Sequence, residues 1–384
     1  MKNRLTAFLL LISVTFTPRI TLSADEPDII QNRPEVITQQ NETDTKEYSA
    51  EDLQTPVEFR EVWGYLMRGE EKVFKGNEPV TDVCYFSCGI NSKGRINTNV
   101  NPPVLQEING KKRKIHMVIA DLQNTSMMRF ILNPEKEARS LLVNDIIEVS
   151  KKFDGVQIDF EAISPDDADN FLEFIRLIKA GLEPDKTLSV ALPAKTRKVK
   201  DAYDYKTISE IVDRVFIMAY DQHWSTSKPG PVASLSWGIN VAAYAITEIP
   251  AEKLIMGIPL YGRAWKDIKI VKKVHPKKKH TAHIKKGKKC RTITTTKYVT
   301  KSRSVRSGNI TKLVSGKNSV KEYSPETGYK IKYSGKTNEV LYCDDVNATM
   351  EKFIYYRRFV DSIGFWRLGM ESPEMWKEII IKYN

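Results

Sequence analysis

Eight short apolar runs recur along the chain, and segments with a helical pattern separate them. Each run is nearly continuous in apolar residues rather than strictly alternating, which is typical of parallel strands that are covered by helices. The predicted strands are Val62–Met67, Asp82–Ser87, Ile115–Asp121, Gly155–Glu161, Leu188–Pro193, Arg214–Tyr220, Leu254–Leu260 and Ile363–Leu368. Eight strands that alternate with helices predict an α/β fold, a (β/α)8 barrel. A doubly wound sheet is the competing architecture, but no GxGxxG turn follows any of these runs.

Pairs in which Asn or Ser precedes Pro mark three predicted helix starts, because Asn and Ser cap helices and Pro suits the first helical position. The pairs are Asn133-Pro134, with a helix through Lys152, Ser164-Pro165, and Ser372-Pro373, with a helix through Trp376. All three fall between predicted strands or after the last one, as the barrel interpretation requires.

About a hundred residues separate the seventh and eighth predicted strands, where connections usually need far fewer. This excess predicts an α+β insertion, to which we assign residues 266–338. Its first part, Lys266–Lys321, contains 19 Lys or Arg residues and one acid, Asp267, for a net charge of +18. Because the whole chain carries +12, the remainder is mildly acidic, and the basic character is confined to this segment.

The N-terminus has the pattern of an export signal. Lys2 and Arg4 precede an apolar stretch, Ala7–Phe16, and the small residues up to Ala24 offer a cleavage site. An apolar stretch of this length is too short to span a bilayer. We therefore expect a signal peptide over residues 1–24, a polar linker over 25–57 and the barrel with its insertion over 58–384, in an exported, monomeric protein.

Composition and cysteine usage narrow the class of protein further. Hydrophobic residues make up 41% of the 384 residues, which excludes a disordered chain. Cys84 and Cys88 lie in one predicted strand, roughly 13 Å apart, too far for a disulfide, so we expect buried free thiols. The sequence leaves undecided whether Cys290 and Cys343 form a disulfide.

Three polar side chains share one face of the predicted strand Gly155–Glu161. Because side chains alternate along a strand, Gln157, Asp159 and Glu161 lie on one side, while the apolar residues between them suit the helix layer. The polar set then points into the barrel, with Glu161 at the C-terminal mouth, where barrel enzymes place their chemistry. Close carboxyl groups repel, so one of them should hold a proton at neutral pH, as a general acid must. A buried network that only stabilises the barrel is the alternative, and strand spacing alone does not decide between the two.

Five segments resemble, in order, the motifs of glycoside hydrolase family 18. The segment FDGVQIDFE, ending at Glu161, resembles the family's catalytic strand, a hydrophobic residue followed by D-G-x-D-x-D-x-E. The others are Met218–Asp221 (MAYD), Gly257–Trp265 (GIPLYGRAW), Cys343–Val346 (CDDV) and Gly364–Gly369 (GFWRLG), which resemble MxYD, GIPxYGRxW, YDD and WxLG. The resemblance spans about residues 61–380 and is closest to the spore-germination and cell-wall-lytic N-acetylglucosaminidase branch.

The resemblance implies hydrolysis of β-linked N-acetylglucosamine polymers, peptidoglycan or chitin-like, by a retaining, substrate-assisted route that is an exception among glycosidases. Glu161 would protonate the glycosidic oxygen, Asp159 would hold the substrate's acetamide N–H, and Tyr220 would donate to the acetamide oxygen as that oxygen attacks. Substrate contacts are expected from Asp221, Trp366, Gln157, Tyr261 and Arg263. The resemblance implies no metal and no cofactor.

Gln157 departs from the family pattern, because an acid stands there in the motif. We expect Asp159 to titrate differently as a result, with altered pH dependence rather than loss of activity. Tyr261 and Arg263 either line the cleft or brace the insertion. A catalytically weak or silent sugar-binding relative is the main alternative, and a barrel that only carries the basic insertion is another. The presence of Glu161 favours the enzyme.

The charge of Lys266–Lys321 predicts electrostatic binding to a polyanion, such as an anionic polymer of the cell envelope. An inert loop that keeps the protein in solution is the alternative. Nucleic acid is not expected as a partner in an exported compartment.

Overall fold

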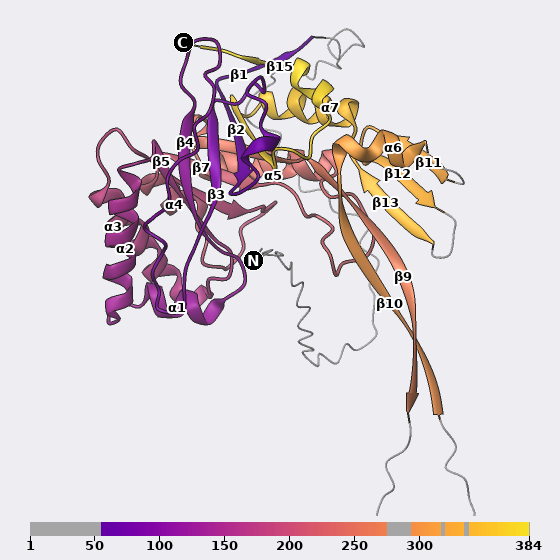
Figure 1. Ribbon diagram of the computed structural model, residues 1–384, viewed down its shortest axis with the longest axis horizontal. Coiled ribbons are helices and arrows are strands. Elements are labelled where there is room, and N and C mark those ends of the chain that lie inside the picture. Colours follow the sequence, from indigo (N-terminus) through magenta and orange to yellow (C-terminus); the bar gives the residue numbers. More distant parts are fainter. Residues whose placement is uncertain (1–54, 275–292, 316–318, 334–337, 384) are drawn as a thin grey trace, which may run out of the picture. The chain divides into compact units, whose positions relative to one another are not determined.

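The computed structural model describes residues 55–274, 293–315, 319–333 and 338–383. Eight parallel strands close into a barrel in the order β14-β2-β3-β4-β5-β6-β7-β8 (Figure 1). They are β2 (Glu61–Met67), β3 (Asp82–Gly89), β4 (Lys114–Asp121), β5 (Gly155–Phe160), β6 (Thr187–Pro193), β7 (Arg214–Met218), β8 (Leu254–Pro259) and β14 (Ser362–Trp366). The predicted barrel is confirmed, and every predicted strand overlaps an observed one.

From β4 onward, α-helices connect the barrel strands on the outside, whereas the connections from β2 to β3 and from β3 to β4 contain no α-helix. They are α1 (Thr125–Leu132), α2 (Glu137–Ser150), α3 (Ala168–Gly181), α4 (Tyr205–Ile211), α5 (Leu235–Glu248) and α7 (Val346–Arg357). A short parallel pair, β1 (Val57–Phe59) with β15 (Ile379–Ile381), joins the two ends of the described barrel.

The helix start predicted at Asn133-Pro134 is wrong. Asn133 ends α1, and α2 begins only at Glu137. The Asn133 side chain accepts a hydrogen bond from the backbone N–H of Glu135 (2.8 Å), so the Asn-Pro pair forms a turn between two helices instead of a cap. The other two predicted starts are confirmed. Ser164 caps a short 3-10 turn (Pro165–Asp167) that leads into α3, and Ser372 precedes the 3-10 helix Pro373–Glu378.

Two apolar layers lie on either side of the barrel wall. On the outside of β5, Phe160 packs against Phe171 and Phe174 of α3, with ring centroids 6.3 and 5.8 Å apart. Inside the barrel, a separate cluster contains the large aromatic residues Trp63, Tyr65, Phe86 and Phe216 together with smaller side chains. The predicted division of β5 into an outer apolar face and an inner polar face is therefore confirmed, because Val156, Ile158 and Phe160 belong to the outer layer.

The insertion between β8 and β14 forms its own five-stranded antiparallel sheet in the order β10-β9-β13-β12-β11 (Figure 1). Its strands are β9 (Tyr261–Val274), β10 (Ile293–Arg306), β11 (Ser319–Ser324), β12 (Gly328–Tyr333) and β13 (Glu339–Cys343), with the short helix α6 (Ile310–Val314) between β10 and β11. The sheet thus starts earlier than residue 266, because β9 follows β8 after one residue, Leu260. It closes over a small core of its own that includes Ala264, Val305, Ile331 and Leu341.

Several sequence predictions concern residues outside the described part of the chain. These are the signal peptide (1–24), most of the linker (25–57), the densest lysines of the insertion and Cys290. Cys84, Cys88 and Cys343 are buried free thiols, which confirms the expectation for the first two. Among the described residues, no helix is both long and apolar enough to cross a membrane.

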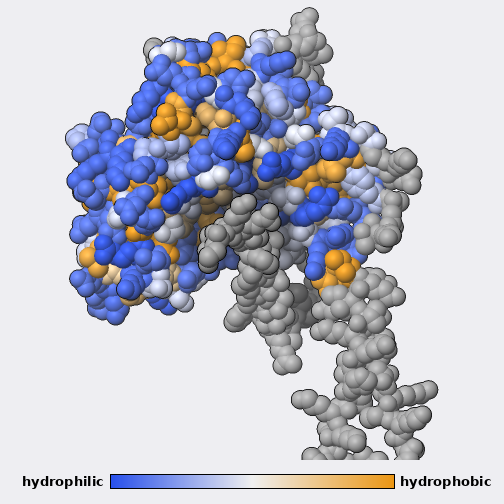
Figure 2. All heavy atoms as spheres, in the orientation of Figure 1, coloured by the Kyte–Doolittle hydropathy of each residue, from blue (hydrophilic) through white to orange (hydrophobic). Residues whose placement is uncertain are grey.

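The surface is predominantly hydrophilic on the face shown in Figure 2, and its hydrophobic residues form small separate groups. Large exposed apolar side chains elsewhere in the described chain, such as Leu122, Phe130 and Leu177, come from different segments. Such scattered residues are normal for a folded domain and do not mark an interface.

A buried ion pair ties α7 to the strand before it, and its removal should destabilise the fold. Lys352 donates to Asp344 at 2.5 Å, and the two side chains are only 2% and 9% exposed. We expect Lys352→Met to lower the free energy of unfolding by about 3–5 kcal/mol, because it leaves the Asp344 carboxylate buried without a partner. Urea unfolding measures this loss. As a control, Lys332→Met removes an exposed pair with Glu322 (49% exposed on both sides) and should leave the unfolding midpoint unchanged. Equal midpoints for both variants would contradict the prediction.

Candidate active site

The polar face of β5 leads from the barrel interior to its C-terminal mouth. Gln157 and Asp159 are buried inside the barrel, with 0% and 2% of their surface exposed. Glu161 follows the last residue of β5, and its backbone N–H donates to the carbonyl of Asp121 at the end of β4 (3.1 Å). Strand geometry therefore places the two acids where the sequence predicts them, one inside the wall and one at the rim.

Asp159 is a buried acid without a full set of partners. Its Oδ1 has no hydrogen-bond partner among the described residues. Burial raises the pKa of Asp159 well above its usual range, and the negative charge of Glu161 raises it further. An acid in this position favours its neutral form and gains most from a ligand that supplies a donor or a positive charge.

Gln157 supplies no charge to replace the acid of the family motif. Neither its Oε1 nor its Nε2 has a hydrogen-bond partner in the described part of the chain. On β3, the buried thiol of Cys84 has a pKa far above normal, chiefly because of burial, with smaller contributions from Asp82 and Asp159, and the Gln157 amide partly offsets the rise. Asp159 therefore has neutral neighbours at this depth, an amide and a protonated thiol, where the motif would provide a second carboxylate.

Glu161 has the pKa expected of a general acid. Its side chain reaches solvent at the mouth, yet the protein around the carboxyl group removes much of its water. This partial desolvation, together with the charge of Asp221, raises the pKa of Glu161 to about 6. A carboxyl group with such a pKa is protonated often enough near neutral pH to donate a proton.

Asp221 is held by the first residues of the insertion. It adopts a left-handed backbone conformation (φ 56°) directly after Tyr220, and its Oδ1 accepts hydrogen bonds from the Tyr261 hydroxyl and the Arg263 guanidinium, both at 2.6 Å. The Arg263 side chain is 9% exposed and that of Asp221 is 42% exposed. Tyr261 and Arg263 therefore hold a residue of the barrel mouth from β9.

Aromatic rings form the interior surface next to the acids. Trp366 at the end of β14 contacts Tyr65 of β2 and Phe86 of β3, with ring centroids 4.9 and 5.0 Å apart. Trp366 is half-buried, so part of its ring remains accessible. The hydroxyls of Tyr65 and Tyr220 are buried and have no hydrogen-bond partner among the described residues. Burial raises the pKa of each, and Asp159 adds a smaller contribution.

Tyr65 and Cys84 were not among the predicted site residues. The alternation along Val62–Met67 places Trp63, Tyr65 and Met67 on one face, so the signal for Tyr65 was present in the sequence. Nothing in the sequence distinguishes its hydroxyl from that of an ordinary core tyrosine. The position of Cys84 beside Asp159 depends on the register between neighbouring strands, which the sequence does not display.

Trp224 and His223 lie in the loop after β7, and each contacts another residue of that loop. Trp224 is 53% exposed, and its indole N–H donates to Thr226 (2.9 Å). His223 contacts the backbone carbonyl of Lys228 through Nδ1 (3.1 Å).

The described residues contain no cluster of three or more His, Cys, Asp or Glu that could hold a metal ion.

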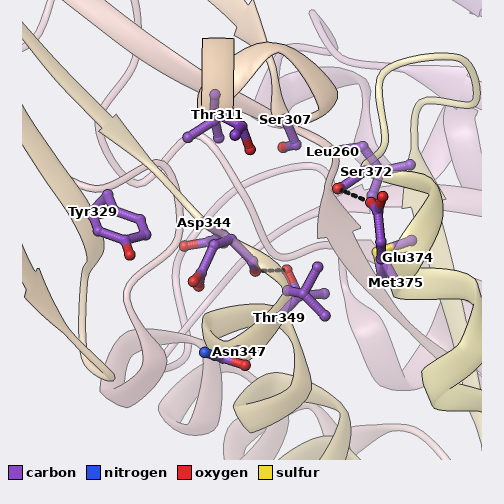
Figure 3. A pocket seen from close by; sticks show the side chains of 13 residues that line it. Leu260, Ser307, Thr311, Tyr329, Asp344, Asn347, Thr349, Ser372, Glu374 and Met375 are labelled. Carbon is purple, nitrogen blue, oxygen red and sulfur yellow. Dashed lines mark hydrogen bonds between the residues drawn. The ribbon is translucent and has the colours of Figure 1, made fainter. Parts of the chain in front are cut away.

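A hollow of about 410 Å³ lies apart from these acids, between α6, the start of α7 and the Pro373–Glu378 helix (Figure 3). Several of its polar side chains already take part in hydrogen bonds: Ser372 donates to Glu374 (2.5 Å), Thr349 donates to the backbone of Asp345 (2.8 Å) and Asp344 accepts from Lys352. None of the predicted site residues lines it. The candidate site is therefore the barrel mouth around Asp159 and Glu161.

Comparison with known proteins agrees with this arrangement. The YdhD glycosylase of Bacillus subtilis is 38% identical over 148 residues, which cover 37% of this chain and 35% of that protein. The cortical fragment-lytic enzyme of Bacillus subtilis is 26% identical over 313 residues, 76% of this chain and 65% of the relative. The chain thus spans about a third of one relative and less than two thirds of the other.

Solved structures share the fold. The Bacillus cereus spore cortex-lytic enzyme SleL has a TM-score of 0.67 at 22% identity, over 85% of this chain and 76% of that one. The sequence profile of the glycosyl hydrolases family 18 matches residues 62–371, well over half of the chain. With the barrel, the acid strand and the segments around Asp221 and Trp366 in the expected places, the chain belongs to the glycosyl hydrolases family 18.

Proposed function

We propose that this chain hydrolyses β-linked polymers that contain N-acetylglucosamine, with Glu161 as general acid. The observation that carries the proposal is the group of buried, unpartnered polar atoms beside Glu161, on Asp159, Gln157, Tyr65 and Tyr220. Buried polar groups in folded proteins almost always have partners. Several such groups together at the mouth of a barrel point to a polar ligand that completes them, and an acetamido sugar offers both a donor and an acceptor.

The proposed reaction uses the substrate's own acetamide as nucleophile. Glu161 gives its proton to the glycosidic oxygen while the bond between that oxygen and the anomeric carbon breaks. The bound acetamide donates its N–H to Asp159 and so favours the ionised form of that acid. The acetamide oxygen attacks the same carbon and forms an oxazolinium ion, whose positive charge the Asp159 carboxylate stabilises. Water, deprotonated by the Glu161 carboxylate, then opens the ring with net retention. Family 18 glycosidases are substrate-assisted exceptions to the two-carboxylate scheme, and membership of this family supports the proposed route.

The remaining site residues orient the sugar. The Tyr220 hydroxyl has no hydrogen-bond partner within the described part of the chain, so it is available to the acetamide oxygen. Burial raises its pKa, with a further contribution from Asp159. Trp366 offers a partly exposed ring on which a sugar can stack. Asp221 stays in place through Tyr261 and Arg263 and lines the same mouth. Gln157 offers the sugar a neutral hydrogen-bonding group in the barrel interior.

Peptidoglycan is the preferred substrate in this proposal, and chitin is the alternative. The support for peptidoglycan is the similarity to a cortical fragment-lytic enzyme over 76% of the chain. Export through the N-terminal signal would bring the protein to such a polymer, and we propose that it acts there as a monomer. A silent sugar-binding protein is the competing function, since Gln157 departs from the family motif.

Digestion of purified peptidoglycan and chitin side by side, with mass analysis of the released ends, tests the proposal. We expect N-acetylglucosamine ends from at least one polymer, and Glu161→Gln should lower the turnover by about 10²–10⁴-fold, because Gln keeps the volume and cannot donate the proton. Binding of oligosaccharides should persist. Glu173→Gln on the exposed side of α3 is the matched control and should act like the unmodified protein. Binding without any cleavage by the unmodified protein would support the silent relative instead.

The pH dependence of hydrolysis should report Glu161. The acid must be protonated, so kcat/KM should fall as the pH rises through its pKa of about 6. Asp221→Asn removes a negative charge that raises this pKa, so Glu161 ionises more readily and the falling limb should move to lower pH. Asp166→Asn, at a side chain that is 87% exposed, should leave the limb in place. A limb that moves to higher pH in Asp221→Asn would contradict the electrostatic cause.

We propose that the basic insertion attaches the protein to an anionic polymer of the envelope. The support is the net charge of +18 over Lys266–Lys321. Retention on envelopes should fall steeply with salt, because exposed charges are screened beyond about 8–10 Å at physiological ionic strength. Co-sedimentation across a salt series should show weaker retention once the lysines between Lys272 and Lys289 are replaced by Gln. Equal, salt-insensitive retention of both proteins would remove the attachment role.

A further inference from the structure

Near Glu161, the backbone at the end of β5 is paired with β4 but not with β6. The pairing of β5 with β6 ends at Ile158 and Val190, before Phe160 is reached. On the other side, pairing with β4 continues through Phe160 and the Glu161 N–H. Because a buried carbonyl without a partner is costly, another group has to take the place of β6 at Phe160.

Tyr203, in the loop between β6 and α4, fills that place. Its hydroxyl donates to the carbonyl of Phe160 at 2.8 Å and accepts from the backbone N–H of Ile163 at 3.3 Å. These two groups stand immediately before Glu161 and two residues after it. Tyr203 is 6% exposed, and its ring meets that of Phe171 on α3 edge to face, with centroids 6.2 Å apart.

A buried ion pair fixes Tyr203 in turn. Lys195 donates to Asp201 at 2.7 Å and to the backbone carbonyl of Tyr203 at 2.6 Å. Asp201 also accepts from the backbone N–H of Tyr203 at 2.9 Å. The Lys195 side chain is only 7% exposed, so water competes little for these bonds. The hydroxyl of Tyr203 therefore projects from a rigid base.

We propose that Tyr203 is a positioning residue for the general acid: its one hydroxyl clamps the backbone before and after Glu161 and so fixes where the carboxyl group points. This inference rests on the proposed catalytic role of Glu161. A general acid must reach the glycosidic oxygen within hydrogen-bond distance, and a displacement of about 1 Å can lower a rate by about 10²-fold. Tyr203 needs no contact with the sugar for this effect.

Tyr203→Phe removes the hydroxyl and keeps the ring, and Tyr205→Phe is a matched control. Tyr205 is equally buried, and its hydroxyl donates to the backbone carbonyl of Pro193, away from Glu161. Two measurements are needed: kcat and KM on the cleaved polymer, and hydrogen exchange of the Ile163 amide in the intact protein. We expect Tyr203→Phe to lower kcat by about 10- to 10²-fold with KM changed by less than about twofold. Exchange at Ile163 should accelerate, and Tyr205→Phe should change neither quantity.

Three outcomes would overturn the inference. Unchanged kcat in Tyr203→Phe despite faster exchange at Ile163 would mean that Glu161 does not depend on the clamp. Equal losses of kcat in both variants would mean a general effect of removing buried hydroxyls. If the unmodified protein cleaved no polymer, the proposed function would fail with it, and the exchange data would then describe a purely structural hydrogen bond.

Discussion

The exclusion of water from the interior of a closed barrel governs the chemistry of this protein. Asp159 is buried inside the barrel, so ionisation of its carboxyl group is unfavourable, and the nearby Glu161 makes this ionisation still less favourable. The fold tolerates this because eight paired strands and the surrounding helices stabilise the barrel independently of the site. The same burial raises the pKa of the Tyr65 and Tyr220 hydroxyls, and Asp159 adds a smaller contribution to each. A residue such as Gln157 fits the same interior because an amide can be buried at lower cost than a second carboxylate.

The insertion is part of the site and not an appendage to it. Its first strand follows β8 almost directly, and Tyr261 and Arg263 reach Asp221 from there. Glu326, between β11 and β12, also accepts from the hydroxyl of Ser236 on α5 at 2.6 Å. The register of β9 with β10 extends over 14 residue pairs, whereas β13 pairs only with Arg263–Lys266. The insertion therefore has a part packed into the five-stranded sheet, next to the barrel mouth, and a two-stranded ribbon formed by the remainder of β9 and β10.

Much of this arrangement was accessible from the sequence because it depends on local periodicity. The apolar runs gave every barrel strand, and the alternation of Gln157, Asp159 and Glu161 gave the inner face of β5. Predictions failed or were missing where the deciding partner is distant. Asn133-Pro134 carries the signal of a cap, yet the preceding helix α1 makes it a turn. The roles of Cys84 and Tyr203 come from neighbouring strands and loops that only the closed barrel brings beside Asp159 and Glu161.

The contact between Tyr65 and Trp366 has a consequence for how the protein folds during its synthesis. The two rings come from the first and last strands of the barrel, about three hundred residues apart in the chain. Contacts of such sequence separation form late and slowly, because the loop between them must close first. A chain whose β14 has not yet left the ribosome already contains both acids but lacks Trp366, the ring that β14 contributes to this aromatic surface. The aromatic surface of the candidate site is therefore complete only when the last barrel strand has paired with β2.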